Sequence, residues 1–530
     1  MLRFVPLLTV TGLFVLSLFG LEAAPWLVVI SVILGALVLL GLYDFFQSRH
    51  TLWRNFPIIA HIRWIAEELH PFLRSYIVES ETEGRPFNNE QRALIYRRAK
   101  NVSSVEPFGS HLDIDKPPYE WLAHSIAAKH TADDSPRIHV GAPGTKQPYS
   151  ASVLNVSAMS FGSLGAHAIE ALSTGAKKGN FYHDTGEGGV SRYHRAGGAD
   201  LVWELGSGYF GCRARDGRFD AARFKDVAQD PQIKMIEIKL SQGAKPGHGG
   251  VLPGAKVTEE IAEARGVPVG ETCVSPPGHT AFSTPIEMME FAASLREMSG
   301  GKPVGIKFCV GNRWELLAIC KAMLETEIRL DFMVVDGGEG GTGAAPAEFL
   351  DHVGAPLRQG LVLARNALVG TGLKDHVRLA CSGKQTSAFA IASSMALGAD
   401  WINTARGFMF SLGCIQSLNC HNNTCPTGIA TTDKGRQRGL VIADKAERVY
   451  NFHRNTMKAL MEVVGAAGLE HPAELTPRHI MHRVTEDIVK PAHRAYDLLD
   501  ANVLLNAPEG TKLANEWAMA QAASFRPLDI

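Results

Sequence analysis

The segment DFMVVDGGEGGTG, residues 331–343, carries the pattern that decides the fold. A short apolar run rich in β-branched residues ends at an aspartate and passes directly into a glycine-rich loop. Such a run is typical of a buried strand of a parallel sheet, and the glycines let the backbone approach a ligand closely. The segment therefore predicts one strand-and-loop unit of an α/β fold.

Seven more short apolar runs surround this segment and alternate with stretches of helical spacing. The predicted strands cover residues 153–159, 181–184, 202–205, 235–240, 304–308, 331–335, 377–381 and 401–404. Eight such units within roughly 250 residues predict a closed (β/α)8 TIM barrel rather than an open doubly wound sheet. Functional side chains are then expected just beyond the C-terminal ends of the strands.

Charged and polar residues follow several of these strands. Lys239, Gln242 and Lys245 lie beyond the fourth strand, and two cations with an amide suit a substrate with two carboxylates. The alternative for this group is a solvated surface patch. Glu187 lies between glycines after the second strand. Its role is that of an acid/base group, of a group that holds an ammonium ion, or of a carboxylate that only accepts hydrogen bonds from backbone N–H groups.

A phosphate site is expected after the last two strands, where glycines expose backbone N–H groups beside Arg406. That is the usual anchor for a mononucleotide in this fold. Lys307 lies inside the fifth strand, where an unpaired ammonium is costly to bury. Beneath a flavin, its charge would stabilise the anion that develops on reduction; the alternative is a salt-bridged core lysine. Each glycine cluster alone could also be a tight βα turn.

Three cysteines lie within twelve residues, at Cys414, Cys420 and Cys425, and a proline follows the last one. This spacing suits an iron–sulfur cluster, although it matches neither ferredoxin pattern. Zinc is the main rival, but a structural zinc needs four ligands, and His421 adjoins Cys420 awkwardly. Three ligands with no nearby fourth cysteine favour a three-iron cluster. The other five cysteines are scattered, which does not suggest a disulfide scaffold.

The N-terminus departs from an otherwise balanced composition with a net charge near −1, which gives no electrostatic case for nucleic acid. Two apolar runs, residues 4–20 and 25–43, are each close to the length of about 20 residues that crosses a bilayer. Because Arg49, Arg54 and Arg63 follow the second run, both termini are expected in the cytoplasm. The alternative is a signal peptide cleaved near Ala24.

These patterns predict four regions. Residues 1–46 form a transmembrane helical hairpin in the inner or cell membrane, and residues 47–104 form a juxtamembrane helical linker. Residues 105–440 form the barrel domain with the cysteine loop, and its first part, to residue 150, is expected to be irregular because it is rich in proline and glycine. Residues 441–530 form a C-terminal helical region.

Several of these motifs, in order over about residues 105–470, resemble the synthase domain of glutamate synthase. They are SAMSFGSL (157–164), GEGG (186–189), QGAKPG (242–247), SPP (275–277), DGGEGGTGA (336–344) and the run from Cys414 to Thr431 that contains CHNNTCPTGIAT. The resemblance implies FMN, a [3Fe–4S] cluster ligated by Cys414, Cys420 and Cys425, and a 2-oxoglutarate site at the barrel rim. It implies that a 2-oxo acid condenses with ammonia and that reduced FMN delivers a hydride to give glutamate.

Site residues follow from the matched positions. The resemblance implies Lys239, Gln242 and Lys245 at the substrate, Glu187 at the ammonia end and Lys307 beside the flavin. The cofactor-binding candidates are Ser157, Ala158, Met159, Ser160, Lys307, Asp336, Gly337, Gly338, Gly341, Thr342, Gly343, Ser382, Gly383, Lys384, Ala405, Arg406 and Gly407.

The sequence also departs from the family. It begins Met1-Leu2 rather than with a catalytic cysteine, so ammonia is expected from solution or from a glutaminase partner. No GxGxxG fingerprint follows a strand, so electrons are expected from ferredoxin, an NADPH-oxidising subunit or a membrane carrier. Three alternatives stay open: an N-methylglutamate-forming or other amine-using synthase, an FMN oxidoreductase acting on a different acid, and a non-catalytic flavin and iron–sulfur electron carrier.

Overall fold

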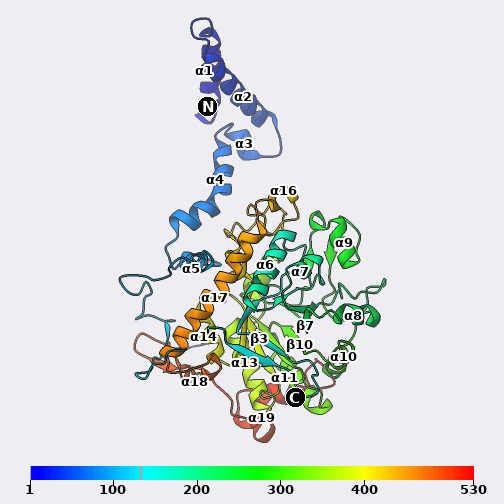
Figure 1. Cartoon of the computed structure of the whole chain (residues 1–530). Helices are drawn as coiled ribbons and strands as arrows, with labels where there is room; N and C mark the ends of the chain where they lie inside the picture. The colour runs from blue at the N-terminus through cyan, green and yellow to red at the C-terminus, as the bar shows by residue number, and fades with distance from the viewer. Residues whose placement is uncertain (1, 132–133, 530) are drawn as a thin grey trace. The chain divides into compact units, whose positions relative to one another are not determined.

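A computed structural model describes residues 2–131 and 134–529 (Figure 1). The chain forms two compact units, Met1–Asn89 and Glu90–Ile530. The predicted juxtamembrane linker is therefore divided, because its last helix, α5 (Asn89–Ala99), lies almost entirely within the second unit.

Eight parallel strands of the second unit close into a barrel, as predicted, in the order β10-β11-β12-β13-β4-β5-β6-β7. They are β4 (Leu154–Val156), β5 (His183–Asp184), β6 (Leu201–Leu205), β7 (Ile233–Lys239), β10 (Val304–Phe308), β11 (Phe332–Asp336), β12 (Arg378–Ser382) and β13 (Trp401–Thr404). The barrel closes where β13 pairs with β4, with Asn403 opposite Asn155. Each strand overlaps a predicted one, because a buried parallel strand must be apolar on both faces.

Side-chain alternation along these strands sends apolar residues outward and charged residues into the barrel. Trp203 of β6 stacks on Phe224 of α8 (Ala221–Ala228), with ring centroids 5.1 Å apart, so its neighbour Glu204 points inward. Register then aligns Glu204 with Glu237 of β7. It also aligns Lys239 of β7 with Lys307 of β10, two residues nearer the C-terminal ends. The fold thereby stacks a lysine layer on a carboxylate layer inside the barrel.

Helices cover the outside of the barrel and follow the strands in turn. They are α6 (Ala166–Gly179), α7 (Arg192–Ala196), α8, α9 (Glu259–Arg265), α10 (Pro285–Met298), α11 (Arg313–Thr326), α12 (Ala347–His352), α13 (Leu357–Gly370), α14 (Ala388–Ala396), α15 (Arg406–Ser411), α16 (Lys434–Gln437) and α17 (Ile442–Ala466). Side chains cap several N-termini; Thr284 and Glu287 form a capping box on α10. The long helix α17 packs along α6 and α14, so the helical shell continues beyond the predicted boundary at residue 440 (Figure 1).

The connection between β7 and α10 is the longest one in the barrel. It holds the two-stranded sheet β8–β9 (Val251–Leu252 and Cys273–Val274), the short helix η3 (Gly254–Lys256) and α9. The loop before β8 carries Gln242 and Lys245. This insertion therefore brings the predicted substrate residues to the C-terminal rim.

Short strands occur in two regions where none was predicted. In the segment that begins at residue 105, β1 (Glu120–Leu122) pairs with a strand of the C-terminal region, and β2 (Arg137–Val140) pairs with β3 (Tyr149–Ser152). The C-terminal region contains β14 (Ile480–Arg483) and β15 (Val489–Pro491), together with η4 (Pro472–Glu474), α18 (Ala492–Ala495), α19 (Val503–Asn506), η5 (Pro508–Gly510) and α20 (Ala514–Met519). β14 pairs both with the nearby β15 and with the distant β1, and no local sequence pattern could reveal the pairing with β1.

The first unit is helical. It contains η1 (Leu2–Phe4), α1 (Val5–Phe19), α2 (Leu27–Phe46), α3 (Thr51–Asn55), α4 (Ala60–Leu73) and the π-helix η2 (Arg74–Val78). Among the described residues, only α2 is both long and apolar enough to cross a membrane. The 15 residues of α1 reach about 22 Å, short of the roughly 30 Å of a bilayer core. The two helices pack together, and Ser31 donates a hydrogen bond to Ser17 at 2.8 Å.

Candidate active site

The predicted substrate residues meet in one hollow at the C-terminal rim of the barrel. The ammonium of Lys239 lies 3.0 Å from the carboxylate of Glu187 and donates to Oε1 of Gln242 at 2.7 Å. The hollow measures about 290 Å³, including its open mouth. Its lining consists of Glu187, Ser207, Lys239, Leu240, Ser241, Gln242, Lys245, Gly247, Gly249 and Pro277.

Burial decides between the two interpretations of the lysine pair. Lys239 is 8% exposed and Lys245 is 3% exposed, so these lysines are not a solvated surface patch. Burial lowers the pKa of Lys245, and Glu187 offsets this only in part. Burial alone would raise the pKa of Glu187, but Lys239, Lys245 and Arg265 together lower it. At neutral pH the site therefore presents a carboxylate between ammonium groups.

Two glycines make room for Glu187. A Cβ on Gly250 would lie 2.2 Å from Oε1 of Glu187, and a Cβ on Gly206 would lie 2.9 Å from its Cβ. Real Cβ atoms do not approach this closely, so any larger residue at either position would push Glu187 away from Lys239. The position of the Glu187 carboxylate therefore depends on the space that these two glycines leave, as well as on its charge pairing with Lys239.

Lys307 is a salt-bridged core lysine inside β10. It is 4% exposed, and its ammonium lies 2.7 Å from Glu204 and 4.0 Å from Glu237. Burial alone would lower its pKa, but Glu204, Glu237, Asp336 and Asp184 raise it well above the ordinary value. Lys307 therefore stays charged inside the barrel.

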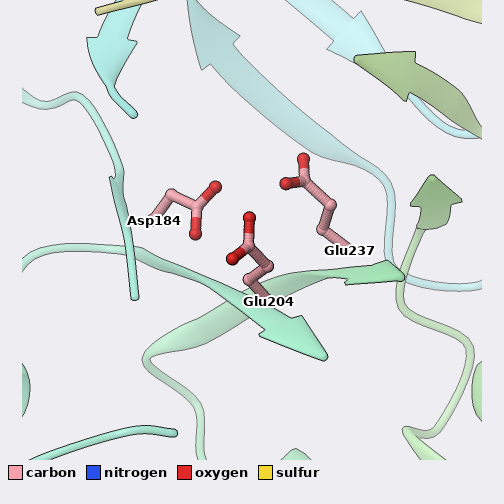
Figure 2. A group of neighbouring side chains, drawn as sticks. All are labelled: Asp184, Glu204 and Glu237. Carbon is pink, nitrogen blue, oxygen red and sulfur yellow. The ribbon is translucent and has the colours of Figure 1, made fainter. Parts of the chain in front are cut away.

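Beneath Lys307, three carboxylates face one another from neighbouring strands (Figure 2). Asp184, Glu204 and Glu237 each offer an oxygen within 4.8 Å of the others, and all three are about 1% exposed. Burial and then the charge of Glu204 raise the pKa of Asp184 to about 7. Burial and then Asp184 raise the pKa of Glu237 well above its usual range. The ammonium of Lys307 is the cation that this group already holds.

The loop between β7 and β8 (residues 240–250), which is the predicted substrate loop, packs directly on the glycine-rich loop after β11. The backbone N–H of Gly243 donates to Oδ2 of Asp336 at 2.9 Å. A Cβ on Gly243 would lie only 1.8 Å from the carbonyl oxygen of Gly337, so this contact requires glycine. The predicted substrate and cofactor loops are thus adjacent.

The predicted phosphate residues gather at the ends of β11, β12 and β13. Arg406 donates to the carbonyl of Thr342 at 2.8 Å, and a Cβ on Gly341 would lie 2.6 Å from its Nε. The hydroxyls of Ser157 and Ser382 lie 3.3 Å apart, on the strands that flank β13. The remaining candidates occupy the same loops: Ala158, Met159 and Ser160 after β4, Gly338 and Gly343 after β11, Gly383 and Lys384 after β12, and Ala405 and Gly407 at the start of α15.

The cysteine loop follows α15 and lies near the glycine-rich loop. The Cβ of Cys420 lies 3.9 Å from the position that a Cβ on Gly343 would occupy. Burial would raise the pKa of Cys425, but hydrogen bonds from Thr427 and from the backbone at Ala430, Thr427 and Ile429 lower it overall. Burial raises the pKa of Cys414. These hydrogen bonds favour the thiolate of Cys425, the form of the side chain that ligates a metal.

The spacing of the three sulfurs bears on the choice between zinc and a cluster. With Zn–S bonds of about 2.3 Å, a tetrahedral zinc would hold its sulfurs about 3.8 Å from one another. Within residues 2–131 and 134–529, the Asp184–Glu204–Glu237 group is the one set of three such ligand atoms that all lie within 4.8 Å of each other. The cysteine sulfurs are thus spread more widely than a single zinc ion requires.

Sequence reasoning missed the interior carboxylates Asp184, Glu204 and Glu237. The sequence did contain a signal for them, because a charged residue inside an apolar strand, such as Lys307, needs a buried partner. Sequence reasoning also missed Arg265 of α9, which donates to Ser160 at 3.4 Å and to the carbonyl of Phe161 at 3.2 Å. Nothing in the local sequence of α9 indicates that its last residue reaches the rim.

Comparisons with known proteins identify the family of this chain. The conserved region in glutamate synthase matches residues 134–470. Glutamate synthase large subunit-like protein YerD of Bacillus subtilis is 37% identical over 477 residues, covering 82% of this chain and 90% of that protein. Archaeal-type glutamate synthase (NADPH) of Thermotoga maritima is 31% identical over 313 residues, covering 59% of this chain and 58% of that enzyme.

Among solved structures, a mutant flavocytochrome b2 with benzoylformate aligns with a TM-score of 0.41 at 12% identity, covering 78% of this chain and 83% of that one. The family match over residues 134–470 includes the substrate loop, the glycine-rich loops and the three cysteines. The chain therefore belongs to the glutamate synthase family, whose members are oxidoreductases that act on CH–NH2 groups.

Proposed function

We propose that this chain reductively aminates 2-oxoglutarate to glutamate, with FMN as the hydride donor and a [3Fe–4S] cluster as the electron path to it. The observation that carries the proposal is the pocket in which two buried lysines and an amide lie beside an ionised glutamate. A five-carbon dicarboxylate with a carbonyl beside one end matches this arrangement, because each carboxylate can take one ammonium group.

Each pocket residue has a defined task in this reaction. Lys245 and the amide of Gln242 bind the carboxylates of the 2-oxo acid, and Lys239 orients the end that carries the carbonyl. Glu187 holds the ammonium and accepts its proton as the amine attacks the carbonyl. The carboxyl of Glu187 then returns the proton to the hydroxyl, which leaves as water. The ammonium of Lys239, 3.0 Å from Glu187, is a second proton donor at this position.

The residues at the ends of β11, β12 and β13 fit FMN. Arg406 and the backbone of Gly383 and Lys384 would hold its phosphate, and the space beside Gly341 that a Cβ would fill leaves room around the guanidinium. Lys307 would supply positive charge beneath the ring system. When bound, FMN supplies the hydride that converts the imine of 2-oxoglutarate to glutamate.

The cysteine loop fits a cluster better than a single ion. Three free thiols lie in one loop, spaced more widely than zinc needs, and one of them has a lowered pKa. Cys420 lies near Gly343, one of the residues that would hold FMN, which supports electron transfer between the two. Ferredoxin, an NADPH-oxidising subunit or a membrane carrier would reduce the cluster.

We also propose that α2 anchors the chain in the inner or cell membrane with the catalytic unit in the cytoplasm, because Arg49, Arg54 and Arg63 follow this apolar helix. The double substitution Val32→Lys and Leu39→Lys should release the protein from membranes, since each lysine costs about 3 kcal/mol near the centre of a span. The matched control, Leu350→Lys on the exposed helix α12, should stay in the membrane fraction. Membrane retention of the double variant would contradict the anchor.

The test of the reaction uses the whole chain purified in detergent and reduced chemically without air. Glutamate formed from 2-oxoglutarate is measured with ammonia and then with methylamine, together with flavin reoxidation. Glutamate in stoichiometric amount with reoxidised flavin is the expected result. Product from methylamine alone would move the function to an N-methylglutamate synthase. No amino acid from either amine, with flavin and cluster bound, would contradict the proposed reaction for the isolated chain.

A further inference from the structure

Four charges of alternating sign connect the substrate pocket to the interior of the barrel. Starting at the pocket, Glu187 lies 3.0 Å from Lys239, and Lys239 lies 3.9 Å from Glu204. Glu204 in turn lies 2.7 Å from Lys307. One end of this charge ladder lines the substrate hollow, and the other end is the lysine assigned above to the flavin.

Glu204 is the member of the ladder that contacts both lysines. Its backbone is fixed in β6, where Trp203 on one side and Leu205 on the other are packed outside the barrel. Its side chain is 1% exposed, and it touches neither the hollow nor solvent. Any effect of Glu204 on the reaction must therefore act through the side chains it contacts, which are Lys239, Lys307 and its hydrogen-bond partner Glu237.

The two neighbouring carboxylates do not share this role. Oε1 of Glu237 has no hydrogen-bond partner, and Glu237 is 4.0 Å from Lys307. Burial followed by the charge of Asp184 raises the pKa of Glu237 well above its usual range, so it keeps its proton at neutral pH. Asp184 accepts a hydrogen bond from the backbone of Gly186 at 3.0 Å, and its pKa is raised to about 7. Glu204 is then the carboxylate that compensates the charge of Lys307.

We propose that Glu204 is a positioning residue that couples the two ends of the active site, because its carboxylate attracts Lys239 from the interior side of the pocket and compensates Lys307 beneath the flavin. This inference rests on the proposed function. A dianionic substrate that draws Lys239 toward the pocket leaves the charge of Glu204 to Lys307 alone. Substrate binding and flavin reduction therefore influence each other, and the influence must be reciprocal.

The substitution Glu204→Gln tests the inference, and Glu237→Gln is its matched control. Both replace a buried carboxyl on adjacent strands by an amide of the same size, but only the first removes a negative charge. Glu204→Gln should lower kcat/KM for 2-oxoglutarate by about 100-fold, because both lysines shift. It should also move the equilibrium between the bound flavin and a reference redox dye about tenfold toward reduced flavin, since an opposing charge is gone. Glu237→Gln should change either quantity less than about threefold, on the same charge argument.

Two readouts separate this inference from the proposed function. A wild-type chain that binds flavin but makes no amino acid would overturn the proposed reaction only. The role of Glu204 would still be tested by the dye equilibrium and by 2-oxoglutarate binding, which is monitored through changes in the flavin spectrum. Equal behaviour of Glu204→Gln and Glu237→Gln in both readouts would overturn the inference, as would a wild-type chain that binds no flavin. If Glu204→Gln does not fold, Glu204→Asp and Glu237→Asp replace the pair. Glu204→Asp should then lower kcat/KM and leave the dye equilibrium unchanged. Wild-type kcat/KM in both aspartate variants would overturn the inference.

Discussion

The carboxylate of Glu187 lies 3.0 Å from the ammonium of Lys239, although the two residues follow different strands of the barrel. Glu187 belongs to the loop after β5, and Lys239 is the last residue of β7. Under the proposed function, a dianionic substrate would compete with Glu187 for this ammonium. That competition would place the negative charge of Glu187 where an ammonium ion or an attacking amine replaces Lys239 as its partner.

Lys239→Met should lower kcat/KM for 2-oxoglutarate by about 10²- to 10³-fold, because it removes a preorganised cation from the reacting end of the pocket. Steady-state assays with chemically reduced enzyme measure this loss. Lys178→Met, on the exposed face of α6, is the matched control and should retain wild-type kinetics. Unchanged turnover by Lys239→Met would remove this lysine from the site.

The affinity for 2-oxoglutarate should depend on pH through Lys245. Its ammonium binds an anion only while protonated, and burial lowers its pKa below the ordinary value of 10.5. KM should therefore rise as pH increases through this lowered pKa, at less alkaline pH than an exposed lysine would give. Lys245→Arg should move the rise to higher pH, since a guanidinium stays charged. If KM depends on pH in the same way in the wild-type protein and in Lys245→Arg, the assignment of Lys245 as the substrate-binding ammonium is contradicted.

The free energy of unfolding of Asp184→Asn should increase relative to that of the wild-type protein as pH rises. The pKa of Asp184 is about 7 in the folded chain against 3.8 for the ordinary side chain, so folding favours its protonated form. Its contribution is favourable below the unfolded value and becomes a cost as pH rises from about 4 to about 7. The neutral asparagine avoids this cost and should gain more than about 1.4 kcal/mol relative to wild type across the window, one pKa unit being worth that much.

Urea unfolding of the two proteins at pH 5 and pH 8 measures this difference. Glu509→Gln, in the short helix η5 near the C-terminus, is the control and should show a pH dependence close to that of wild type. A stability difference between Asp184→Asn and wild type that does not grow with pH would contradict the raised pKa of Asp184.

Gly243→Ala should disrupt the contact between the substrate and cofactor loops. Its Cβ would lie 1.8 Å from the carbonyl oxygen of Gly337, so one loop must move, at a cost of about 1–3 kcal/mol. Thermal unfolding and 2-oxoglutarate binding should both be impaired. Gly278→Ala lies in the same insertion with no atom within 4 Å of the added Cβ, and it should change neither. Equal effects of both substitutions would show that the close contact is not decisive.

Cys425→Ser should remove the iron–sulfur cluster and leave the barrel folded, because the thiolate is a ligand and the cluster does not build the core. Iron content, acid-labile sulfide and the electron paramagnetic resonance signal of the oxidised protein measure the loss. Cys320→Ala, in the buried face of α11, should retain all three. Zinc in place of iron in the wild-type protein would contradict the cluster.

The sequence alone determined the barrel, because a buried parallel strand must be apolar on both faces and each such run is local. It also located the lysines, the glycine loops and the three cysteines, since chemical function depends on residue type and short spacing. Only the tertiary structure decided which groups meet. Glu204, Glu237 and Asp184 became part of one cluster because register aligns β5, β6 and β7 and alternation turns these side chains inward.

The same reason explains the remaining differences. The pairing of β1 with β14 and the packing of α17 on α6 join segments that are distant in the chain, so no local pattern predicts them. The burial of Lys239 and Lys245, which separates a binding pocket from a surface patch, likewise depends on how the insertion after β7 folds over the rim. Residue types identified the chemistry in this protein, and long-range packing fixed the distances and charge states with which that chemistry operates.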